Sequence, residues 1–188
     1  MKCLLAQATQ KFSTLPAIIS GQRILTYDQF EHSVAATVRK LKSLGVTPGS
    51  RVAIQSPNCS EYLILLVALW RIKATACLLS TRLPPMMKRT QLKILRCKNF
   101  FQSLHDDIPI LTENKTTLSA TMDIPLKHPA TILFTSGSTG TPKAVVHTLV
   151  NHHYSALGSN QNIRIKPKDR WLLSLPLYPK MTDQDAAD

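Results

Sequence analysis

The chain has 188 residues, of which 44% are hydrophobic and 18% charged, a composition that excludes a disordered or low-complexity protein. Lysine and arginine total 23 against 11 acidic residues, which gives a formal net charge of +12. The longest apolar run, Tyr62 to Trp70, has nine residues, whereas a membrane-spanning helix needs about 20. The amino terminus lacks the apolar centre of a signal peptide. The sequence therefore predicts a cytoplasmic protein without a membrane span.

Repeating apolar positions predict alternating strands and helices in the first hundred residues. Strands are expected at 24–26, 51–55 and 74–79, and helices at 30–44 and 61–71. Gly45 is expected to end the first helix, and Pro48-Gly49 to turn the chain into the next strand. The stretch at 74–79, apolar except for Thr75, is typical of a strand covered on both faces.

The later part of the chain continues this alternation. A helix is expected at 85–95, an extended segment at 99–101, a polar loop at 112–120, a strand at 130–134, a helix at 148–160 and a last short strand at 170–175. Strands and helices that alternate at these lengths predict an α/β fold, in which parallel strands are joined by crossover helices.

Cysteine and histidine spacing favours free thiols over disulfides or a metal site. Four cysteines lie 56, 18 and 20 residues apart, without a C-x-x-C pair: Cys3, Cys59, Cys77 and Cys97. We interpret Cys59 and Cys77 as thiols of the core. Three histidines come close together, but their spacing does not place three ligands on one helix face, so no metal ligands are predicted: His147, His152 and His153.

The positive charge is concentrated in one stretch. Between Glu61 and Asp106 there are no acids but eight bases: Arg71, Lys73, Arg82, Lys88, Arg89, Lys93, Arg96 and Lys98. Such a stretch could follow a phosphate backbone. Four of these bases have helical spacing opposite Met86, Leu92 and Leu95, and this pattern favours a solvated helix face instead. A basic module that binds a polyanion therefore remains the remote alternative.

One segment carries the chemistry. The predicted strand that ends at Phe134 runs directly into Thr135-Ser136-Gly137-Ser138-Thr139-Gly140-Thr141-Pro142-Lys143. Glycine lets a backbone approach an anion, hydroxyls and successive N–H groups donate hydrogen bonds, and lysine supplies a mobile counter-charge. The segment is not a Walker A loop, because Pro142 precedes the lysine and Ala144 follows it. These residue types predict a polyphosphate site.

This segment resembles the phosphate-binding signature of the adenylate-forming family: the AMP-forming acyl-CoA synthetases, firefly luciferases and peptide-synthetase adenylation domains. Further likeness runs through roughly residues 3–178 and is weakest at 85–123. It includes Ser56-Pro57-Asn58, Ala144 to Thr148, and Asp169 to Tyr178. Within the family, the combination looks most like the ortho-succinylbenzoate–CoA ligases of menaquinone and phylloquinone synthesis.

The resemblance implies an acid–thiol ligase with two half-reactions. A carboxylic acid reacts with ATP and Mg²⁺ to give an acyl-adenylate and pyrophosphate, and CoA then displaces AMP. Lys143 would be the catalytic residue, and the ATP phosphates would be held by the loop as a whole: Thr135, Ser136, Gly137, Ser138, Thr139, Gly140 and Lys143. No metal ligands, nucleic acid or membrane span are implied, and the oligomeric state stays open.

The end of the chain departs from this pattern. After Tyr178 the family continues with a histidine and a glycine-containing helix, whereas this sequence has a polar tail at 179–188. We therefore expect an incomplete N-terminal AMP-binding domain at 1–178, a tail outside the family pattern at 179–188, and no C-terminal domain. Two alternatives stay open beside the ortho-succinylbenzoate ligase: a non-catalytic nucleotide-binding fragment, and a synthetase for another acyl or aryl acid.

Overall fold

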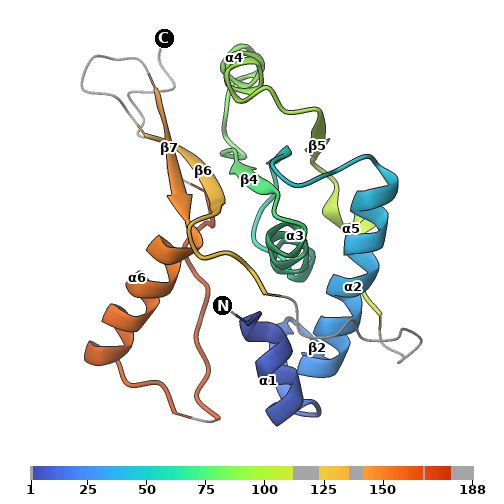
Figure 1. Ribbon diagram of the computed structural model, residues 1–188, viewed down its shortest axis with the longest axis vertical. Helices are drawn as coiled ribbons and strands as arrows, with labels where there is room; N and C mark the ends of the chain where they lie inside the picture. The colour runs from blue at the N-terminus through green and yellow to red at the C-terminus, as the bar shows by residue number, and fades with distance from the viewer. Residues whose placement is uncertain (1, 112–122, 136–141, 167, 179–188) are drawn as a thin grey trace.

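The computed structural model describes residues 2–111, 123–135, 142–166 and 168–178, and within them the strands form two sheets (Figure 1). The larger has the order β5-β3-β4-β6-β7. Its strands are β3 (Arg51–Ile54), β4 (Thr75–Leu78), β5 (Asn99–Phe101), β6 (Pro129–Thr135) and β7 (Lys143–Thr148). The first four strands in this order are parallel, and β7 pairs with β6 in the antiparallel direction. The other elements pack around this mixed sheet.

Six helices and a small hairpin surround this sheet in the described residues. The helices are α1 (Leu4–Phe12), α2 (Tyr27–Ser43), α3 (Ser60–Arg71), α4 (Pro85–Leu95), α5 (Leu104–Asp107) and α6 (Leu149–Asn162). The hairpin pairs β1 (Pro16–Ser20) with β2 (Arg23–Thr26). In the described part of the chain, no helix has both the length and the apolarity needed to cross a bilayer.

The two faces of the sheet belong to different cores. Val52 and Ile54 of β3 join the larger core, which also contains the buried side chains of α2 and α3. Ala53 and Cys77 face the other way, into a smaller cluster with Leu95 of α4. Because alternate residues of a strand point to opposite faces, α4 covers one face of the sheet while α2 and α3 cover the other. Both faces of the central strands are therefore buried.

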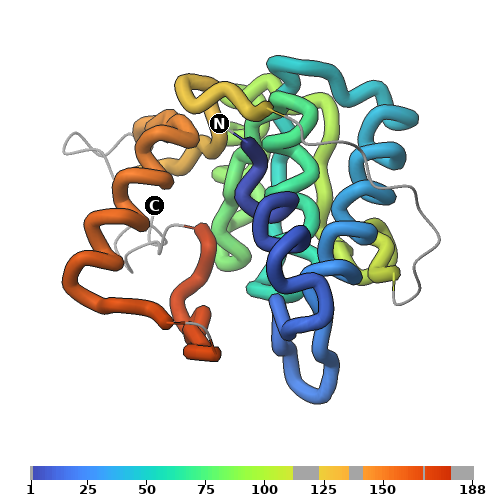
Figure 2. The backbone as a smooth tube through the Cα atoms, turned by 60° about the horizontal axis from the view of Figure 1, so that its bottom comes forward, coloured from blue at the N-terminus to red at the C-terminus, as the bar shows by residue number. Residues whose placement is uncertain are grey.

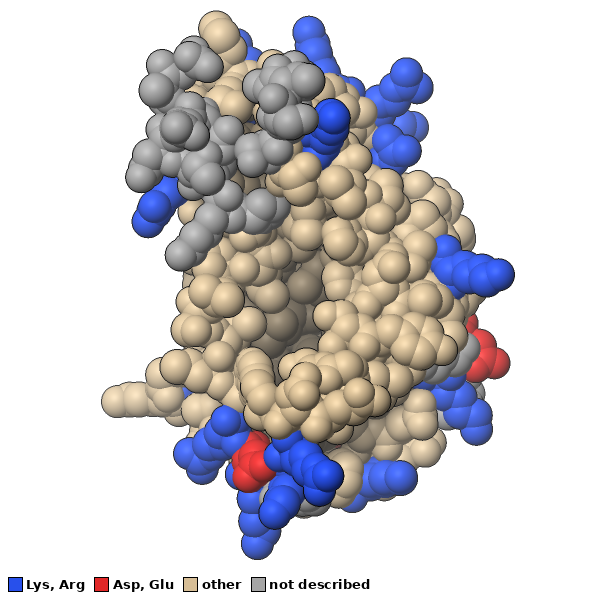
Figure 3. All heavy atoms as spheres, turned by 90° about the vertical axis from the view of Figure 1, so that its left-hand side faces the viewer, with Lys and Arg blue, Asp and Glu red and all other residues tan. Residues whose placement is uncertain are grey.

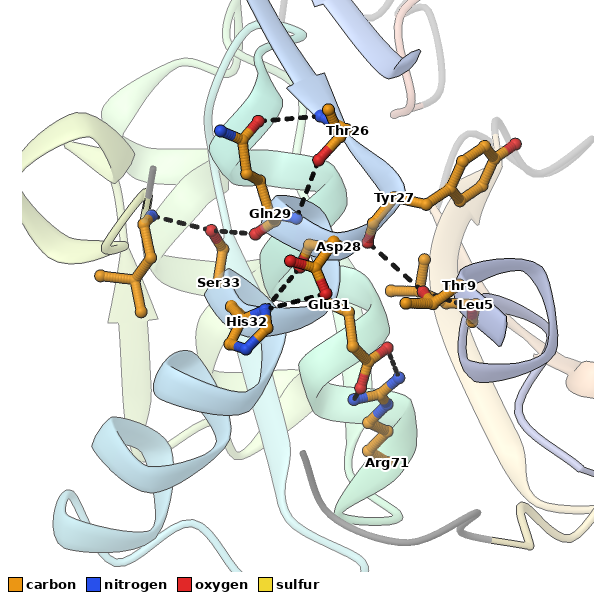
Figure 4. A network of polar contacts seen from close by, with 11 residues as sticks. Leu5, Thr9, Thr26, Tyr27, Asp28, Gln29, Glu31, His32, Ser33 and Arg71 are labelled. Carbon is orange, nitrogen blue, oxygen red and sulfur yellow. Dashed lines mark hydrogen bonds and ion pairs between the residues drawn. The ribbon is translucent and has the colours of Figure 1, made fainter. Parts of the chain in front are cut away.

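Polar contacts fasten the helices of the larger core to one another (Figure 4). Arg71 at the end of α3 donates two hydrogen bonds to the Glu31 carboxylate of α2, and both side chains are about 95% buried. Thr9 of α1 donates to the backbone carbonyl of Tyr27. The α2 helix begins at a capping box, in which Thr26 accepts from the Gln29 N–H while the Gln29 side chain accepts from the Thr26 N–H.

The α6 helix is attached to the sheet through Trp70 and His152. The Trp70 indole donates to the Ala130 carbonyl oxygen at 3.1 Å, and its ring stacks on the His152 ring. The Nε2 atom of His152 lies 2.9 Å from the Thr131 hydroxyl oxygen. Burial, helped by the neighbouring His147, lowers the pKa of His152, so the neutral ring is favoured at this packing surface.

Most elements agree with the sequence analysis. The helix at 85–95 and the extended segment at 99–101 are confirmed residue for residue, and the parallel arrangement of the first four strands is confirmed. Gly45 follows α2 with φ +77°, a left-handed conformation that favours glycine, as expected. The polar loop predicted at 112–120 lies outside the described residues.

Two expectations were wrong and one is met in part. The segment 170–175 is not a strand; its Leu173 and Leu175 carbonyls bond to a side chain instead of a neighbouring strand. Met86 is 80% exposed, so it does not belong to the buried side of its helix. Cys59 is only half-buried, although it packs against the larger core. The elements α1, β1 and β7 were not predicted.

Candidate functional site

The carboxyl ends of the parallel strands β3, β4 and β6 share one edge of the sheet. Leu78 of β4 lies opposite Leu133 of β6, so Ser80 and Thr135 follow two residues later at the same level. Ligands of open α/β sheets bind in the crevice outside the carboxyl ends of the strands. This edge is therefore the candidate site.

Thr135 and Lys143 are the two described ends of the predicted phosphate loop. They are partners in the β6–β7 ladder, and the Thr135 hydroxyl lies 3.5 Å from the Lys143 carbonyl oxygen. Both residues are exposed. The antiparallel pairing thus brings together the first and last residues of the predicted site. Five predicted site residues lie outside the described residues: Ser136, Gly137, Ser138, Thr139 and Gly140.

A buried amide network supports the same edge. The Gln55 side chain follows β3 and donates to the Ser80 carbonyl oxygen at 2.8 Å. Its own carbonyl oxygen accepts from the Gln102 amide at 2.8 Å. These bonds connect the residues that follow β3, β4 and β5, so the strand ends next to the loop are held at fixed relative positions.

Asn58, in the turn after β3, binds the segment that comes after α6. Its amide donates to the carbonyl oxygens of Leu173, at 3.3 Å, and Leu175, at 2.8 Å, and its own oxygen accepts from the Leu177 N–H at 3.0 Å. Figure 2 shows this segment turning back from the end of α6. Three hydrogen bonds from one side chain thus bring residues more than a hundred positions apart to the same edge.

Tyr178 adds a second connection to this edge. Its hydroxyl lies 2.7 Å from the Thr81 hydroxyl, just after β4. Nearby, the Tyr62 hydroxyl is buried without a hydrogen-bond partner in the described residues. Burial, together with Tyr178 and Cys59, raises the pKa of Tyr62. Tyr62 is therefore a neutral phenol beside the edge.

A buried carboxylate lies at the start of α3. Glu61 accepts from the His105 ring at 2.8 Å and from Arg23 at 3.3 Å. Burial acts to raise the pKa of Glu61, but the hydrogen bond from its own backbone and the contact with His105 outweigh it and lower the pKa. Burial raises the pKa of the adjacent Cys59 thiol. This cluster holds a stable carboxylate and an unreactive thiol.

The face that carries α6 and β7 is mostly uncharged and hollowed at its centre, with lysines and arginines around its margin (Figure 3). Exposed large apolar side chains are frequent in β7, α6 and the segment that follows them: Val145, Val146, Tyr154, Leu157, Ile163, Ile165, Trp171, Leu172, Leu173 and Leu175. The +12 charge is therefore not gathered into a continuous basic groove on this face.

The described residues contain no group of three or more His, Cys, Asp or Glu side chains placed to hold a metal ion. His147 and His152 do approach each other, with ring centroids 5.8 Å apart. His152, however, is already bound to Thr131.

The residues that surround the ends of the predicted loop were not predicted as part of the site. Asn58 and Tyr178 were noted only inside stretches of family likeness, and Gln55 was noted only as part of a strand. Their contacts join residues far apart in the sequence. Local periodicity does not reveal such pairs.

The fold and this edge together define the class of the protein. Residues 5–182 match the family model described as AMP-binding enzyme, so the chain belongs to the AMP-binding enzyme family. This agrees with the resemblance seen in the loop sequence.

Among individual proteins, the chain is similar to the 2-succinylbenzoate–CoA ligases. It is 31% identical over 183 residues to that of Bacillus licheniformis, with 86% of this chain and 37% of the relative covered. It is 32% identical over 174 residues to that of Geobacillus kaustophilus, with 86% and 36% covered. The chain thus spans little more than a third of the length of these curated relatives.

A solved structure shows the same fold. The o-succinylbenzoate CoA synthetase of Bacillus subtilis, in complex with the acyl-adenylate intermediate OSB-AMP, superposes with a TM-score of 0.79 at 26% identity. The match covers 94% of this chain and 50% of that one. The architecture is therefore that of the N-terminal part of an adenylate-forming enzyme.

Proposed function

We propose that this chain is the phosphate-binding portion of an AMP-forming carboxylate–CoA ligase whose acid is 2-succinylbenzoate. The observation that carries the proposal is the pairing of Thr135 with Lys143, which holds the two ends of the predicted loop together at the carboxyl end of β6, next to the parallel strand β4. Relatives named for this reaction, and a related structure with OSB-AMP bound, support the choice of acid.

In this proposal the loop binds the β- and γ-phosphates of Mg-ATP. Gly137 and Gly140 let the backbone approach the phosphate oxygens, and the hydroxyls of Ser136, Ser138 and Thr139 donate to them. Thr135 is the last residue of β6, where the chain enters the loop. Lys143, across the ladder from Thr135, supplies the positive charge.

The chemistry then follows from positioning and charge. The acid's carboxylate oxygen attacks the α-phosphorus of ATP, a P–O bond forms, and the bond to pyrophosphate breaks. Negative charge builds on the leaving pyrophosphate, where Lys143 and the loop N–H groups offset it. The CoA sulfur next attacks the acyl carbon and AMP leaves. The network of Gln55, Ser80 and Gln102 keeps the strand ends rigid during these steps.

A second candidate is a nucleotide-binding protein without turnover. It rests on the same pairing of Thr135 with Lys143, because binding of a phosphate chain by the predicted loop requires neither an acid site nor a CoA site. Such a protein would bind Mg-ATP through the same loop and form no AMP. A ligase for another aryl or acyl acid is the remaining alternative.

The test joins residues 1–178 to the corresponding remainder of the Bacillus licheniformis ligase. AMP formation is measured with CoA, Mg-ATP and either 2-succinylbenzoate, benzoate or a fatty acid. We expect AMP with 2-succinylbenzoate and at least tenfold less after Lys143→Ala. In parallel, calorimetry measures Mg-ATP binding to the 188-residue chain. Binding without AMP formation would support the second candidate, and AMP formation that is indifferent to Lys143→Ala would overturn the proposed site.

A further inference from the structure

The outward side of α4 carries a row of exposed side chains. Met86, Thr90 and Ile94 follow one another at intervals of four residues, so they line up along one side of the helix. Met86 is 80% exposed and Ile94 is 51% exposed, and Thr90 between them is also exposed. The other side of the helix is buried through Leu95, which belongs to the smaller core. Two large apolar side chains of this row therefore face solvent.

A row of bases runs beside this first row. Arg89 and Lys93 come three positions after Met86 and Thr90, a spacing that makes them neighbours on the helix surface. Lys93 is exposed and Arg89 is partly exposed. Arg96 follows the helix, is exposed, and has a left-handed φ of +51°. Apolar and basic side chains thus share what we call the α4 surface: Met86, Arg89, Thr90, Lys93, Ile94 and Arg96.

A groove opens at the end of α4 and continues this surface. It has a volume of about 510 Å³ and is lined by Gly49, Arg51, Ile94 and Arg96. Arg51, the first residue of β3, donates to the Leu95 carbonyl oxygen at 3.3 Å. That bond engages one of the five N–H groups of the guanidinium and holds it beside the groove. Two arginines at one groove favour a phosphate group, which guanidinium groups bind through paired hydrogen bonds.

Acidic side chains are scarce in the part of the chain that builds this surface. Between His32 and His105 the sequence has one acid, Glu61. Glu61 is 3% exposed and lies at the start of α3, on the opposite face of the sheet from α4. Within the described residues, the bases of the α4 surface form no ion pair. The α4 surface therefore offers positive charge to a partner.

An anionic lipid bilayer fits this combination better than a nucleic acid does. Lipid headgroups attract the bases, and the exposed Met86 and Ile94 can bury apolar area at the boundary between headgroups and acyl chains. A single-stranded nucleic acid favours aromatic side chains on which its bases stack, and α4 contains none. Phe100, after the helix, is in contact with the Lys88 ammonium, whose Nζ lies 5.9 Å from the ring centroid.

We propose that the α4 surface docks this chain on anionic lipid bilayers. The lipid phosphates lie against the basic row and in the groove between Arg51 and Arg96, while Met86 and Ile94 enter the interfacial region of the bilayer. The contact is peripheral and depends on both charge and apolar area. It uses no residue of the phosphate loop, so it goes beyond the proposed ligase chemistry and is tested without any measurement of AMP.

The test is flotation of the 188-residue chain with lipid vesicles in a density gradient, in which bound protein rises and aggregated protein does not. The vesicles are phosphatidylcholine alone, or phosphatidylcholine with about 30% phosphatidylglycerol as the anionic lipid. We expect binding to the anionic vesicles only. Raising the salt from about 50 to about 500 mM should release the chain, because salt screens exposed charges. Equal binding to both kinds of vesicle, or binding to neither, would overturn the proposal.

Two variants test the bases. Lys93→Gln and Arg96→Asn each remove one charge, and asparagine tolerates the left-handed backbone at position 96. Each should weaken binding to anionic vesicles about fivefold at low salt. The matched control is Lys11→Gln, which removes an exposed lysine of α1, at the far end of the molecule from α4 (Figure 1), and should have little effect. Equal weakening by Lys93→Gln and Lys11→Gln would indicate a general attraction of the +12 chain and would exclude docking through α4.

A second pair of variants tests the apolar contribution. Ile94→Gln should weaken binding to anionic vesicles severalfold at every salt concentration, because it removes apolar area without changing the charge. Leu157→Gln changes a side chain of similar exposure, 46%, on α6 and should leave binding unchanged. Loss of binding in Leu157→Gln instead would place the contact on the α6 side and contradict the proposal.

Competition separates the lipid surface from a nucleic acid. Single-stranded RNA, added at the same phosphate concentration as the anionic lipid, should not displace the chain from the vesicles, since the α4 surface lacks stacking residues. Displacement by RNA would identify a nucleic acid as the favoured partner and overturn docking on lipid.

Discussion

The side-chain amide of Asn58 lies 2.8 Å from the carbonyl oxygen of Leu175, 117 positions later in the chain. The turn after β3 thereby holds the segment beyond α6. The hydrogen bonds from Asn58 to Leu173 and from Leu177 to Asn58 hold the same segment.

Replacing Asn58 should release this segment. Asn58→Ala removes all three hydrogen bonds, and Asn58→Asp keeps only the acceptor for the Leu177 N–H. We expect trypsin to cleave after Arg170 faster in both variants, with Asn58→Ala the more sensitive. Unchanged cleavage in Asn58→Ala would show that other contacts hold the segment. The control is Asn99→Ala, which removes the hydrogen bond from the Asn99 side-chain amide to the Leu44 carbonyl oxygen after α2.

The buried pair of Glu31 and Arg71 should be far more sensitive to single changes than to paired ones. Glu31→Gln or Arg71→Met leaves a charged partner about 95% buried, and each should lower the free energy of unfolding by about 3–5 kcal/mol. The double variant Glu31→Gln/Arg71→Met leaves neither charge and should restore much of this loss. Urea denaturation of the four proteins measures the cycle, and strictly additive losses would contradict the interaction.

Glu61 should make stability depend on pH in the acid range. Its pKa in the folded chain lies below its ordinary value of 4.5, so the ionised form is favoured by folding. That stabilisation is complete above about pH 4.5 and is lost as the pH falls toward the folded pKa. Glu61→Gln should flatten this part of the stability curve measured in urea, whereas Asp106→Asn, on the exposed side of α5, should leave it unchanged.

Lys143 should contribute to nucleotide binding through charge. Loss of a charge-assisted hydrogen bond weakens binding by about tenfold or more, so Lys143→Ala should raise the Kd for Mg-ATP by that factor and affect AMP less, because AMP lacks the β- and γ-phosphates. Lys127→Ala, at the opposite end of β6, is the matched control. Equal loss in the two variants would point to a general charge effect.

Exposed apolar residues after α6 should promote self-association. Leu172 is 83% exposed and lies between Trp171 and Leu173, which are 61% and 39% exposed. Contiguous apolar surface favours association, whereas isolated apolar residues do not. Leu172→Ser should shift sedimentation profiles toward the monomer. Met86→Ser removes a side chain of similar exposure, 80%, on α4 and should have little effect. If both act alike, the cluster is not the cause.

Local signals predicted most of the fold. The α4 helix, Pro85–Leu95, begins with a proline, which favours the first turn of a helix, and is followed by the left-handed Arg96. The β4 strand is buried throughout because both its faces are covered. Strands at the edge of the sheet were harder to predict from the sequence. The β7 strand is exposed along most of its length, so it lacks the pattern of buried residues that reveals a strand.

Long-range contacts explain the remaining errors. The apolar segment 170–175 has the composition of a strand, but its backbone is bound by the Asn58 side chain. The phosphate-binding role of the segment from Thr135 to Lys143 rests on residue type alone and stays a prediction. The pairing of its two ends with each other, and the support from Gln55, depend on the assembled sheet.

The strand order also bears on how the chain folds as it is synthesised. The pairs β3–β4 and β3–β5 involve residues no later than Phe101, so three parallel strands can assemble while β6 is still untranslated. The edge of β4 then stays open until Pro129 and the residues after it emerge. Closing that long gap carries a loop entropy that local pairs do not have. Docking of β6, and with it the completion of the nucleotide edge, should therefore be the slow step of folding.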